Sequence, residues 1–413
     1  MDGDPSVGPS LDSFSLFLPL PYRVSLIIVL GVWAWGANLH YLNLIKIDVP
    51  SLIRYPGRTS HTLPSHHLST YRLATLLTVP LGLSLLLFWV ITQGNAKSVL
   101  EWEILPNIYL LILVICFILP VSFISGSGRH RFLATLRRIS IGGIAEAQDG
   151  KFGDILMADA LTSYAKVLGD LFVALCMFVT RTGSTSKPDR ACGGQFMVPI
   201  ILAIPSLIRL RQCLIEYGRV QRAYNKGGPS KDGWGGQHLA NALKYATAFP
   251  VIILSAIQRG YEDGKYGLSE AGLFRLWYGL LFVLLNSFYS FYWDVAKDWD
   301  LSLFSSDREN PQHPWGLRRL RHFHAKEIYY VVIGLDFVLR CTWSVKLSPH
   351  LDHFNDVEGG IFLMEVLEVF RRWVWIFFRV ETEWVRSNGG RGLPVVVDQD
   401  ILLGEFPVKF DED

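Results

Sequence analysis

Residues 362–384, FLMEVLEVFRRWVWIFFRVETEW, are the stretch from which the fold is predicted. The stretch is apolar enough to lie in a membrane, yet it contains Glu365, Glu368, Arg371, Arg372 and Arg379. A charged side chain at the centre of a bilayer helix costs roughly 2.5–3.5 kcal/mol, so such groups face the protein interior, pair, or border a water-filled cavity. Glu368 and Arg372 are four residues apart and share a helical face, whereas Arg371 points about 100° away from it. We interpret the two arginines as an anion-binding part of a transport pathway.

The composition of the whole chain agrees with a membrane protein. Of its 413 residues, 50% are hydrophobic and only 18% are charged, a profile that favours a polytopic membrane protein over a soluble one. The net charge is +2 and no basic patch is interleaved with aromatic residues, so no nucleic-acid partner is expected. The five cysteines contain no CxxC pair and predict no disulfide framework. The sequence has no HExxH spacing, Gly-rich phosphate loop or nucleophile elbow, and therefore predicts no enzyme, no metal site and no cofactor.

Long apolar segments recur along the chain and predict an all-α, polytopic transmembrane helical bundle, because a bilayer core of about 30 Å takes about 20 apolar residues. The fifth segment is short and ends near Arg209. Lys and Arg are concentrated after the first, third, fifth and seventh segments, which places those loops in the cytosol, the N-terminus on the opposite side and the C-terminus inside. The nine predicted spans are 23–43, 72–92, 105–125, 156–180, 196–210, 239–258, 273–295, 327–346 and 360–380.

The same pattern divides the chain into five parts. A lumenal tail (1–22) precedes the N-terminal helices (23–125), and a transport core (156–385) precedes a cytosolic tail (386–413). A cytosolic connector (126–155) lies between the N-terminal helices and the transport core, and it alternates basic and apolar residues over 129–145. This alternation predicts a helix that lies in the membrane interface.

Ionisable residues occur inside five of the predicted spans. In the fourth span, Asp159, Thr162, Ser163 and Lys166 follow a helical spacing that places them on one face. Later spans contain Lys244 with Tyr245, Asp294 with Asp298, and Asp336 with Arg340 and Trp343. Arginine binds a tetrahedral oxyanion through a bidentate fork and lysine binds it as a point charge. Carboxylates beside them repel anions that have no proton to donate, so a mixed site favours phosphate over sulfate.

Simpler interpretations remain open for single residues. The Asp336–Arg340 pair is also typical of a structural ion pair, and Asp294 and Asp298 also fit the cytosolic end of a span. Lys244 also fits a side chain that reaches to the interface. Glu381 and Glu383 are expected in the cytosolic interface without a specific role. The spread of these groups over five candidate helices nevertheless favours one shared polar cavity.

Six stretches together resemble the EXS-domain family, the membrane domain of eukaryotic phosphate exporters. They follow the family order over about residues 150–385, and WGANLHYLNLIKIDVP (35–50) is similar to an earlier helix of that family. The matching stretches are ADALTS (158–163), RLRQCLIEY (209–217), NALKYATAF (241–249), YWDVAKDWDL (292–301), DFVLRCTW (336–343) and EVFRRWVWIFFRVETEW (368–384).

The resemblance implies roles for individual residues. Lys244, Arg340, Arg371 and Arg372 would bind phosphate, Asp294 and Asp298 would orient these cations, and Trp343 would act as a gate. Asp159, Thr162 and Tyr245 match further residues that line the family's phosphate pathway.

The sequence is similar to short EXS proteins of the fungal ER-retention-defective type, which lack the SPX domain that senses inositol pyrophosphates. This similarity implies a multi-pass Golgi protein that moves inorganic phosphate from the lumen to the cytosol and supports glycosylation and the retention of Golgi and ER proteins. The implied partners are the lipid bilayer, Golgi glycosyltransferases, coat machinery and a second copy of the chain in a homodimer. The alternative is a sorting adaptor that retains glycosyltransferases by direct contact and transports nothing.

Overall fold

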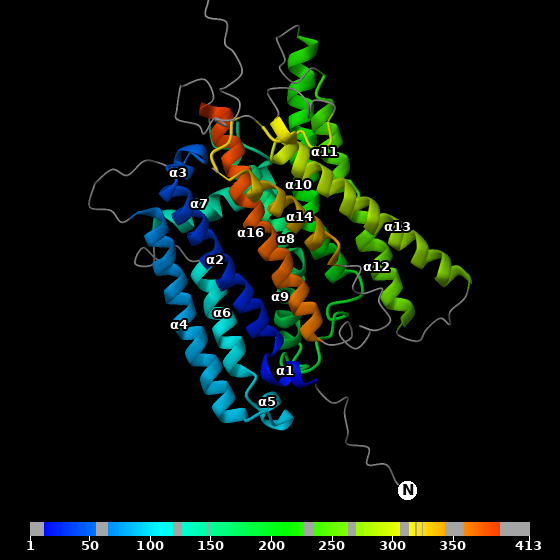
Figure 1. Cartoon of the computed structure of the whole chain (residues 1–413). Helices are drawn as coiled ribbons and strands as arrows, with labels where there is room; N and C mark the ends of the chain where they lie inside the picture. The colour runs from blue at the N-terminus through cyan, green and yellow to red at the C-terminus, as the bar shows by residue number, and fades with distance from the viewer. Residues whose placement is uncertain are drawn as a thin grey trace, which may run out of the picture.

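The computed structural model of the chain describes residues 12–54, 65–118, 126–146, 149–226, 234–262, 270–305, 314–318, 320–323, 325–342 and 358–388. Across these ranges the backbone is helical, with short π- and 3-10 segments and no β-strand (Figure 1). The predicted all-α bundle is therefore confirmed.

The first part of the chain folds into a helical layer built around α2. Its helices are α1 (Ser13–Phe17), α2 (Leu20–Leu44), α3 (Val49–Leu52), α4 (His66–Thr92), α5 (Ala96–Glu101) and α6 (Ile104–Ile118). Helices α2, α4 and α6 pack side by side (Figure 1), and the Tyr109 hydroxyl donates to the Leu77 carbonyl across α6 and α4 at 2.8 Å. The end of the predicted tail (1–22) is helical, since α1 and the start of α2 lie within it.

The connector is helical over residues 126–142, so most of the helix predicted for residues 129–145 is present. It consists of α7 (Gly126–Arg137) and the π-segment η2 (Arg138–Gly142), which continues directly from α7. Next come α8 (Lys151–Ser163) and α9 (Ala165–Val179), which are bent by 62° relative to each other. The fourth predicted span is therefore not one straight helix.

The bend between α8 and α9 corrects one predicted helical face. The Thr162 hydroxyl donates to the Asp159 carbonyl at 2.7 Å, a local bond that competes with the helical ladder just before the break. Lys166 lies beyond the break and is exposed, whereas Asp159 and Ser163 are buried. Lys166 therefore does not share a face with the buried polar residues of α8.

The second half of the bundle contains the longer helices. These are α10 (Met197–Asn225), α11 (Gly236–Ala246), α12 (Ala248–Glu262), α13 (Glu270–Trp293), the π-segment η4 (Asp294–Asp298), the 3-10 turn η6 (Pro314–Gly316), α14 (Lys326–Arg340) and α16 (Glu358–Asn388). Helix α10 continues for sixteen residues beyond Arg209, so the helix is longer than the predicted fifth span. Hydropathy falls at Arg209, but the structure buries this arginine inside the bundle.

Five helical stretches are long and apolar enough to cross a membrane, namely Leu20–Leu44, His66–Thr92, Ala96–Ile118, Met197–Asn225 and Gly236–Ile257. The bent pair α8–α9 makes a sixth if it counts as one span. Each of the nine predicted spans overlaps a helix of the structure, but the count of nine stays a prediction. Helix α16 is absent from the five, and its charges are accommodated by contacts with α2, α8 and α14.

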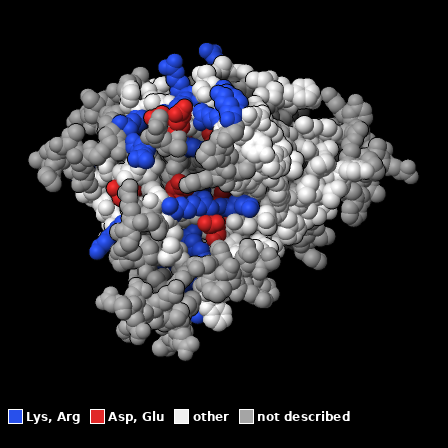
Figure 2. Space-filling model, turned by 90° about the horizontal axis from the view of Figure 1, so that it is seen from above, with Lys and Arg blue, Asp and Glu red and all other residues white. Residues whose placement is uncertain are grey.

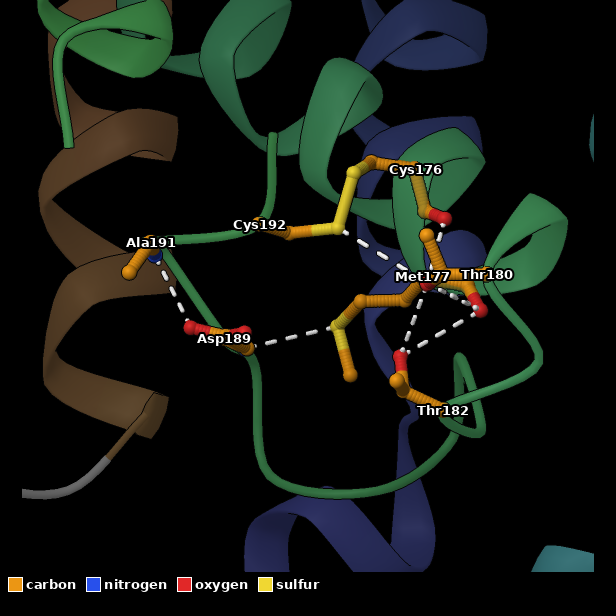
Figure 3. The surroundings of a disulfide bond; sticks show 7 residues. All are labelled: Cys176, Met177, Thr180, Thr182, Asp189, Ala191 and Cys192. Atoms are coloured by element: carbon orange, nitrogen blue, oxygen red, sulfur yellow. Dashed lines mark hydrogen bonds between the residues drawn. A yellow bond between two sulfur atoms is a disulfide. The ribbon is translucent and has the colours of Figure 1, made fainter. Parts of the chain in front are cut away.

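A disulfide joins Cys176 of α9 to Cys192, which overturns the expectation that the cysteines form none (Figure 3). The two Cα atoms are 6.1 Å apart and sixteen residues separate the cysteines in the sequence. The bond fixes the loop after α9 against that helix, and the Asp189 amide donates to the Met177 sulfur at 3.3 Å in the same region. Cys176 lies in an apolar segment, where a free cysteine packs as a small hydrophobic residue. Its position in the sequence therefore did not indicate a disulfide.

Candidate functional site

Polar side chains from six elements meet in the middle of the bundle, and we call them the central charged cluster. Viewed from above, Lys, Arg, Asp and Glu gather on one part of the face while a broad neighbouring area is uncharged (Figure 2). The cluster consists of Asp159, Thr162 and Ser163 of α8, Arg209 of α10, Lys244 and Tyr245 of α11, Asp294 and Asp298 of η4, Asp336 and Arg340 of α14, and Glu368, Arg371, Arg372 and Arg379 of α16.

Arg340 and Arg371 share two aspartates. Arg340 forms ion pairs with Asp336 at 3.1 Å and with Asp294 of η4. Arg371 reaches Asp336 at 3.1 Å and Asp294 at 3.5 Å, and it also pairs with Glu368 at 2.6 Å. The Asp336–Arg340 pair is therefore part of a network that ties α14, α16 and η4 together. As the sequence predicted, Arg371 reaches different partners from Arg372.

Lys244 faces the interior and does not extend to the interface. Its ammonium lies 3.7 Å from Asp294 and 3.8 Å from Asp298, and the residue is 7% exposed. The ammonium also lies 4.9 Å from the centroid of the Tyr245 ring, a favourable cation–π distance. The two aspartates meet one cation because they occupy a π-segment, a geometry that is frequent at functional sites.

Asp159 is held by Arg209 and Tyr245. Arg209 approaches Asp159 at 2.6 Å, and the Tyr245 hydroxyl donates to the same carboxylate at 2.5 Å. Arg209 was not among the predicted site residues. Its signal was present in RLRQCLIEY, where the helical period of α10 continues through it. Asp159 and Tyr245 were predicted site residues, and the structure brings both into the cluster.

Arg372 differs from the other cations of the cluster in its partners. Its Nε donates to the Ser163 hydroxyl at 2.9 Å and its Nη2 donates to the Thr162 hydroxyl at 3.3 Å. The guanidinium lies 4.4 Å from the centroid of the Trp375 ring. Within the described part of the chain, no carboxylate forms an ion pair with it. This arginine is 8% exposed, so a buried positive charge is held by neutral groups at the α8–α9 break.

Arg372 can accept an anion on grounds of charge. The cluster has six cationic side chains and five carboxylates, and Glu383, which pairs with Arg379, balances the remaining charge. Arg372 is the cation of the cluster that forms no ion pair with a described residue, and an anion beside it would supply a direct partner. Among the described residues, no group of three or more His, Cys, Asp and Glu is placed to hold a metal ion.

The predictions for Trp343 and for the interface residues Glu381 and Glu383 have different outcomes. Trp343, the predicted gate, lies outside the described residues. Glu381, expected in the interface without a role, is fully buried and forms an ion pair with Arg318. It also accepts from the Tyr329 hydroxyl and, at 2.7 Å, from the His322 amide. Glu383 forms an ion pair with Arg379 at 3.2 Å.

A second ionic group closes the opposite end of α16. Glu358 pairs with Arg23 of α2 at 2.7 Å and with Arg190 of the disulfide-bonded loop at 2.8 Å. Arg190 also lies 3.8 Å from Asp170 of α9. Burial opposes the charged form of Arg190, but the Glu358 and Asp170 carboxylates more than offset it and raise the pKa of Arg190 above its usual value. The loop, α2, α9 and α16 are thus joined at this end.

The comparisons with known proteins match nearly the whole chain. The EXS family matches residues 18–385, a wider range than that of the recognised motifs. Protein ERD1 homolog 1 of Schizosaccharomyces pombe is 32% identical over 381 residues, which cover 91% of this chain and 94% of that protein. Protein ERD1 homolog 2 of the same organism is 28% identical over 393 residues, with coverage of 88% and 96%.

A relative of a different kind covers a smaller share. Solute carrier family 53 member 1 of Mus pahari is 30% identical over 251 residues, which are 58% of this chain and 33% of that protein. Taken with the match over residues 18–385, these similarities show that the chain belongs to the EXS family.

Proposed function

We propose that the protein moves inorganic phosphate across the Golgi membrane, from the lumen to the cytosol, by way of the central charged cluster. The observation that carries this proposal is Arg372, a buried cation that contacts two hydroxyls and has no carboxylate partner among the described residues. An oxyanion beside it would receive charge-assisted hydrogen bonds from the guanidinium, which are the strong ones in a low-dielectric interior.

The surroundings of Arg372 favour a hydrogen phosphate over a fully ionised anion. The Ser163 hydroxyl bonds to the Glu368 carboxylate at 2.8 Å, so an acceptor lies one bond away from Arg372. A phosphate that keeps a proton can donate it to this carboxylate, whereas sulfate would meet only repulsion there. The network of Arg340 and Arg371 holds the carboxylates in place, so they do not move to neutralise Arg372.

The α8–α9 break supports transport rather than a purely structural role. Transporters commonly form their substrate sites where a membrane helix is interrupted, since the broken backbone supplies polar groups at mid-membrane depth. Thr162 and Ser163 are the last two residues of α8, and α9 begins two residues after Ser163. The hydroxyls that contact Arg372 therefore belong to the interruption itself.

The disulfide supports the proposed orientation. Disulfides persist in oxidising compartments and are rare in the cytosol. The loop that contains Cys192 is one of those with few Lys and Arg residues, which the positive-inside rule assigns to the lumen. The disulfide and the low number of Lys and Arg residues thus both favour a lumenal position for this loop. Recovery of phosphate released in the lumen would support glycosylation and, through it, the retention of Golgi glycosyltransferases.

Phosphate uptake into proteoliposomes tests the proposal. We expect saturable uptake of radiolabelled phosphate by the wild-type protein and at least about 10-fold less by Arg372→Ala, since a hydrogen bond to a charged group contributes about 1.5–3 kcal/mol. Arg386→Ala is the matched control, because Arg386 is an exposed arginine of the same helix whose ion pair, with the half-exposed Asp300, lies outside the cluster.

Two outcomes would count against phosphate transport. Uptake no greater than that of empty liposomes, with or without a pH gradient, would favour the sorting adaptor instead. Equal uptake by the wild type and Arg372→Ala would mean that transport does not use this arginine. An adaptor would also keep its retention activity in cells that express a folded Arg372→Ala protein.

A further inference from the structure

We propose that the corner between η2 and α10 binds the headgroup of an anionic phospholipid in the leaflet that contains the α7–η2 connector. This site is separate from the central charged cluster and does not depend on phosphate transport. A groove of about 520 Å³ runs along the outer face of α10. Its lining is apolar at Leu207, Leu210, Leu214 and Ile215; Arg211 lies part-way along it, and Gly218 and Arg222 line its end.

The order of residues along the groove fits a lipid. At 1.5 Å per residue, the positions of Arg211 and Arg222 are about 16 Å apart along the helix, and Leu214 and Ile215 lie between them. Arg222 folds back toward Gly218, which brings its guanidinium closer to Arg211. An acyl chain would therefore lie along Leu207 and Leu210, on the other side of Arg211, while the headgroup lies between the two guanidinium groups.

The connector fixes the depth of the arginine end. Arg211 donates to the Ser140 carbonyl at 3.1 Å and to the Ile141 carbonyl at 2.6 Å, both in the π-segment that ends the connector. The Ile141 side chain beside these carbonyls is 70% exposed, as expected for a residue that faces lipid. A helix with this alternation lies at the boundary between headgroups and acyl chains, so Arg211 is at headgroup depth.

Arg211 and Arg222 both have positive charge and N–H donors with which to bind a headgroup. A guanidinium has five N–H groups, of which Arg211 directs two hydrogen bonds to the connector and Arg222 directs one, at 3.1 Å, to the Gly218 carbonyl. Neither forms an ion pair with another described residue. The one carboxylate of α10, on Glu216, is occupied by Lys151 and by Arg219. The positive charge of this corner is therefore not balanced from within the helix.

Gly218 provides the space for the headgroup. A Cβ atom at this position would lie 3.7 Å from the Arg222 guanidinium, in ordinary contact with it. A larger side chain would extend from there into the basic end of the groove. Substitution of Gly218 thus fills the site without changing its charge, which separates the shape of the site from its electrostatics.

Native mass spectrometry of the detergent-purified full chain tests this site with equal amounts of dioleoylphosphatidylserine and dioleoylphosphatidylcholine. We expect the wild type to retain phosphatidylserine preferentially. The Arg211→Gln/Arg222→Gln double variant should lose about 30-fold of this preference, on the usual contribution of two basic residues near anionic lipid. Gly218→Leu should lose it as well, whereas Arg211→Lys/Arg222→Lys should keep most of it.

The control variant is Arg181→Gln/Lys187→Gln, which removes two exposed charges from the disulfide-bonded loop and should keep the preference. Equal retention of both lipids by the wild type would overturn the proposal. So would a preference that survives both the double glutamine variant and Gly218→Leu. Displacement of the lipid by millimolar inorganic phosphate would also overturn it, because the groove would then be a site for a soluble anion.

Discussion

Substitution of the adjacent residues Arg371 and Arg372 of α16 is predicted to have different effects, one mainly on stability and the other mainly on transport. Arg371 touches three carboxylates, on Glu368, Asp336 and Asp294, at 2.6, 3.1 and 3.5 Å. Arg372 contacts only hydroxyls and an aromatic ring among the described residues. We therefore expect Arg371→Ala to destabilise the bundle strongly, and Arg372→Ala to impair transport with little effect on stability.

The contacts set the size of each effect. Removing one partner of a buried ion pair typically costs 3–5 kcal/mol, because the remaining charge stays buried without compensation. In Arg371→Ala the aspartates keep Arg340, but Glu368 loses the one cation that pairs with it among the described residues, so we expect a loss of about 3–5 kcal/mol. Arg372→Ala also removes a buried charge that has no direct ion-pair partner among the described residues. This relief offsets most of the lost hydrogen bonds to Ser163 and Thr162, and we expect a net loss of about 1 kcal/mol.

Thermal unfolding in detergent, followed by tryptophan fluorescence, measures the first effect, and phosphate uptake per folded protein measures the second. Arg386→Ala serves again as the control and should change neither quantity. The reasoning is refuted if Arg372→Ala lowers the unfolding temperature as much as Arg371→Ala does. It is also refuted if Arg371→Ala unfolds at the wild-type temperature, since the three ion pairs would then contribute nothing.

Three further predictions concern other parts of the bundle. Glu381→Gln should lower stability by about 3 kcal/mol, because Arg318 loses its buried carboxylate, and a thermal shift within error of zero would contradict this. Cys176→Ser should lower the free energy of unfolding by about 3 kcal/mol, as expected for a disulfide that closes a loop of about fifteen residues. The wild type measured with a reductant should show the same loss of stability. An unchanged stability of the reduced wild type would mean that the disulfide does not stabilise the fold. Lys244→Met should reduce phosphate uptake at least about 10-fold, because Asp298 loses its nearer cation, and full uptake would exclude Lys244 from the pathway.

Charge inside an apolar segment has few permitted arrangements, and this brings most of the predicted site residues together. Nine of the ten lie in the central charged cluster, and the tenth, Trp343, lies outside the described residues; their role in binding phosphate stays a prediction. The sequence also drew attention to Ser163, Asp336, Glu368 and Arg379 without assigning them to the site, whereas Arg209 was missed. A charged residue inside an apolar segment indicates that an oppositely charged or polar partner lies nearby. The sequence spacing does not identify the helix that supplies this partner.

Other features depend on contacts between distant segments and left no local signal. The bend at Tyr164 interrupts a stretch whose residue spacing fits a continuous helix, and the spacing gave no sign of it. The disulfide depends on how the loop after α9 returns to that helix. Glu381 was expected in the cytosolic interface without a specific role, yet Arg318, sixty-three residues earlier in the sequence, lies against it and forms an ion pair.

The distribution of ion pairs along α16 limits how the protein can move. Glu358 holds one end to α2 and the disulfide-bonded loop, Arg371 holds the middle to α14 and η4, and Glu381 holds the other end through Arg318. A rigid displacement of α16 would break buried ion pairs at all three levels, at about 3–5 kcal/mol each. A change of angle at the α8–α9 break that keeps the Asp159–Arg209 and Asp170–Arg190 ion pairs would disturb mainly the hydrogen bonds from Arg372 to the Thr162 and Ser163 hydroxyls, which involve one neutral partner and are weaker than ion pairs. We therefore expect α16 to act as the fixed frame, and the broken helix beside Arg372 to be the element that moves when an anion passes.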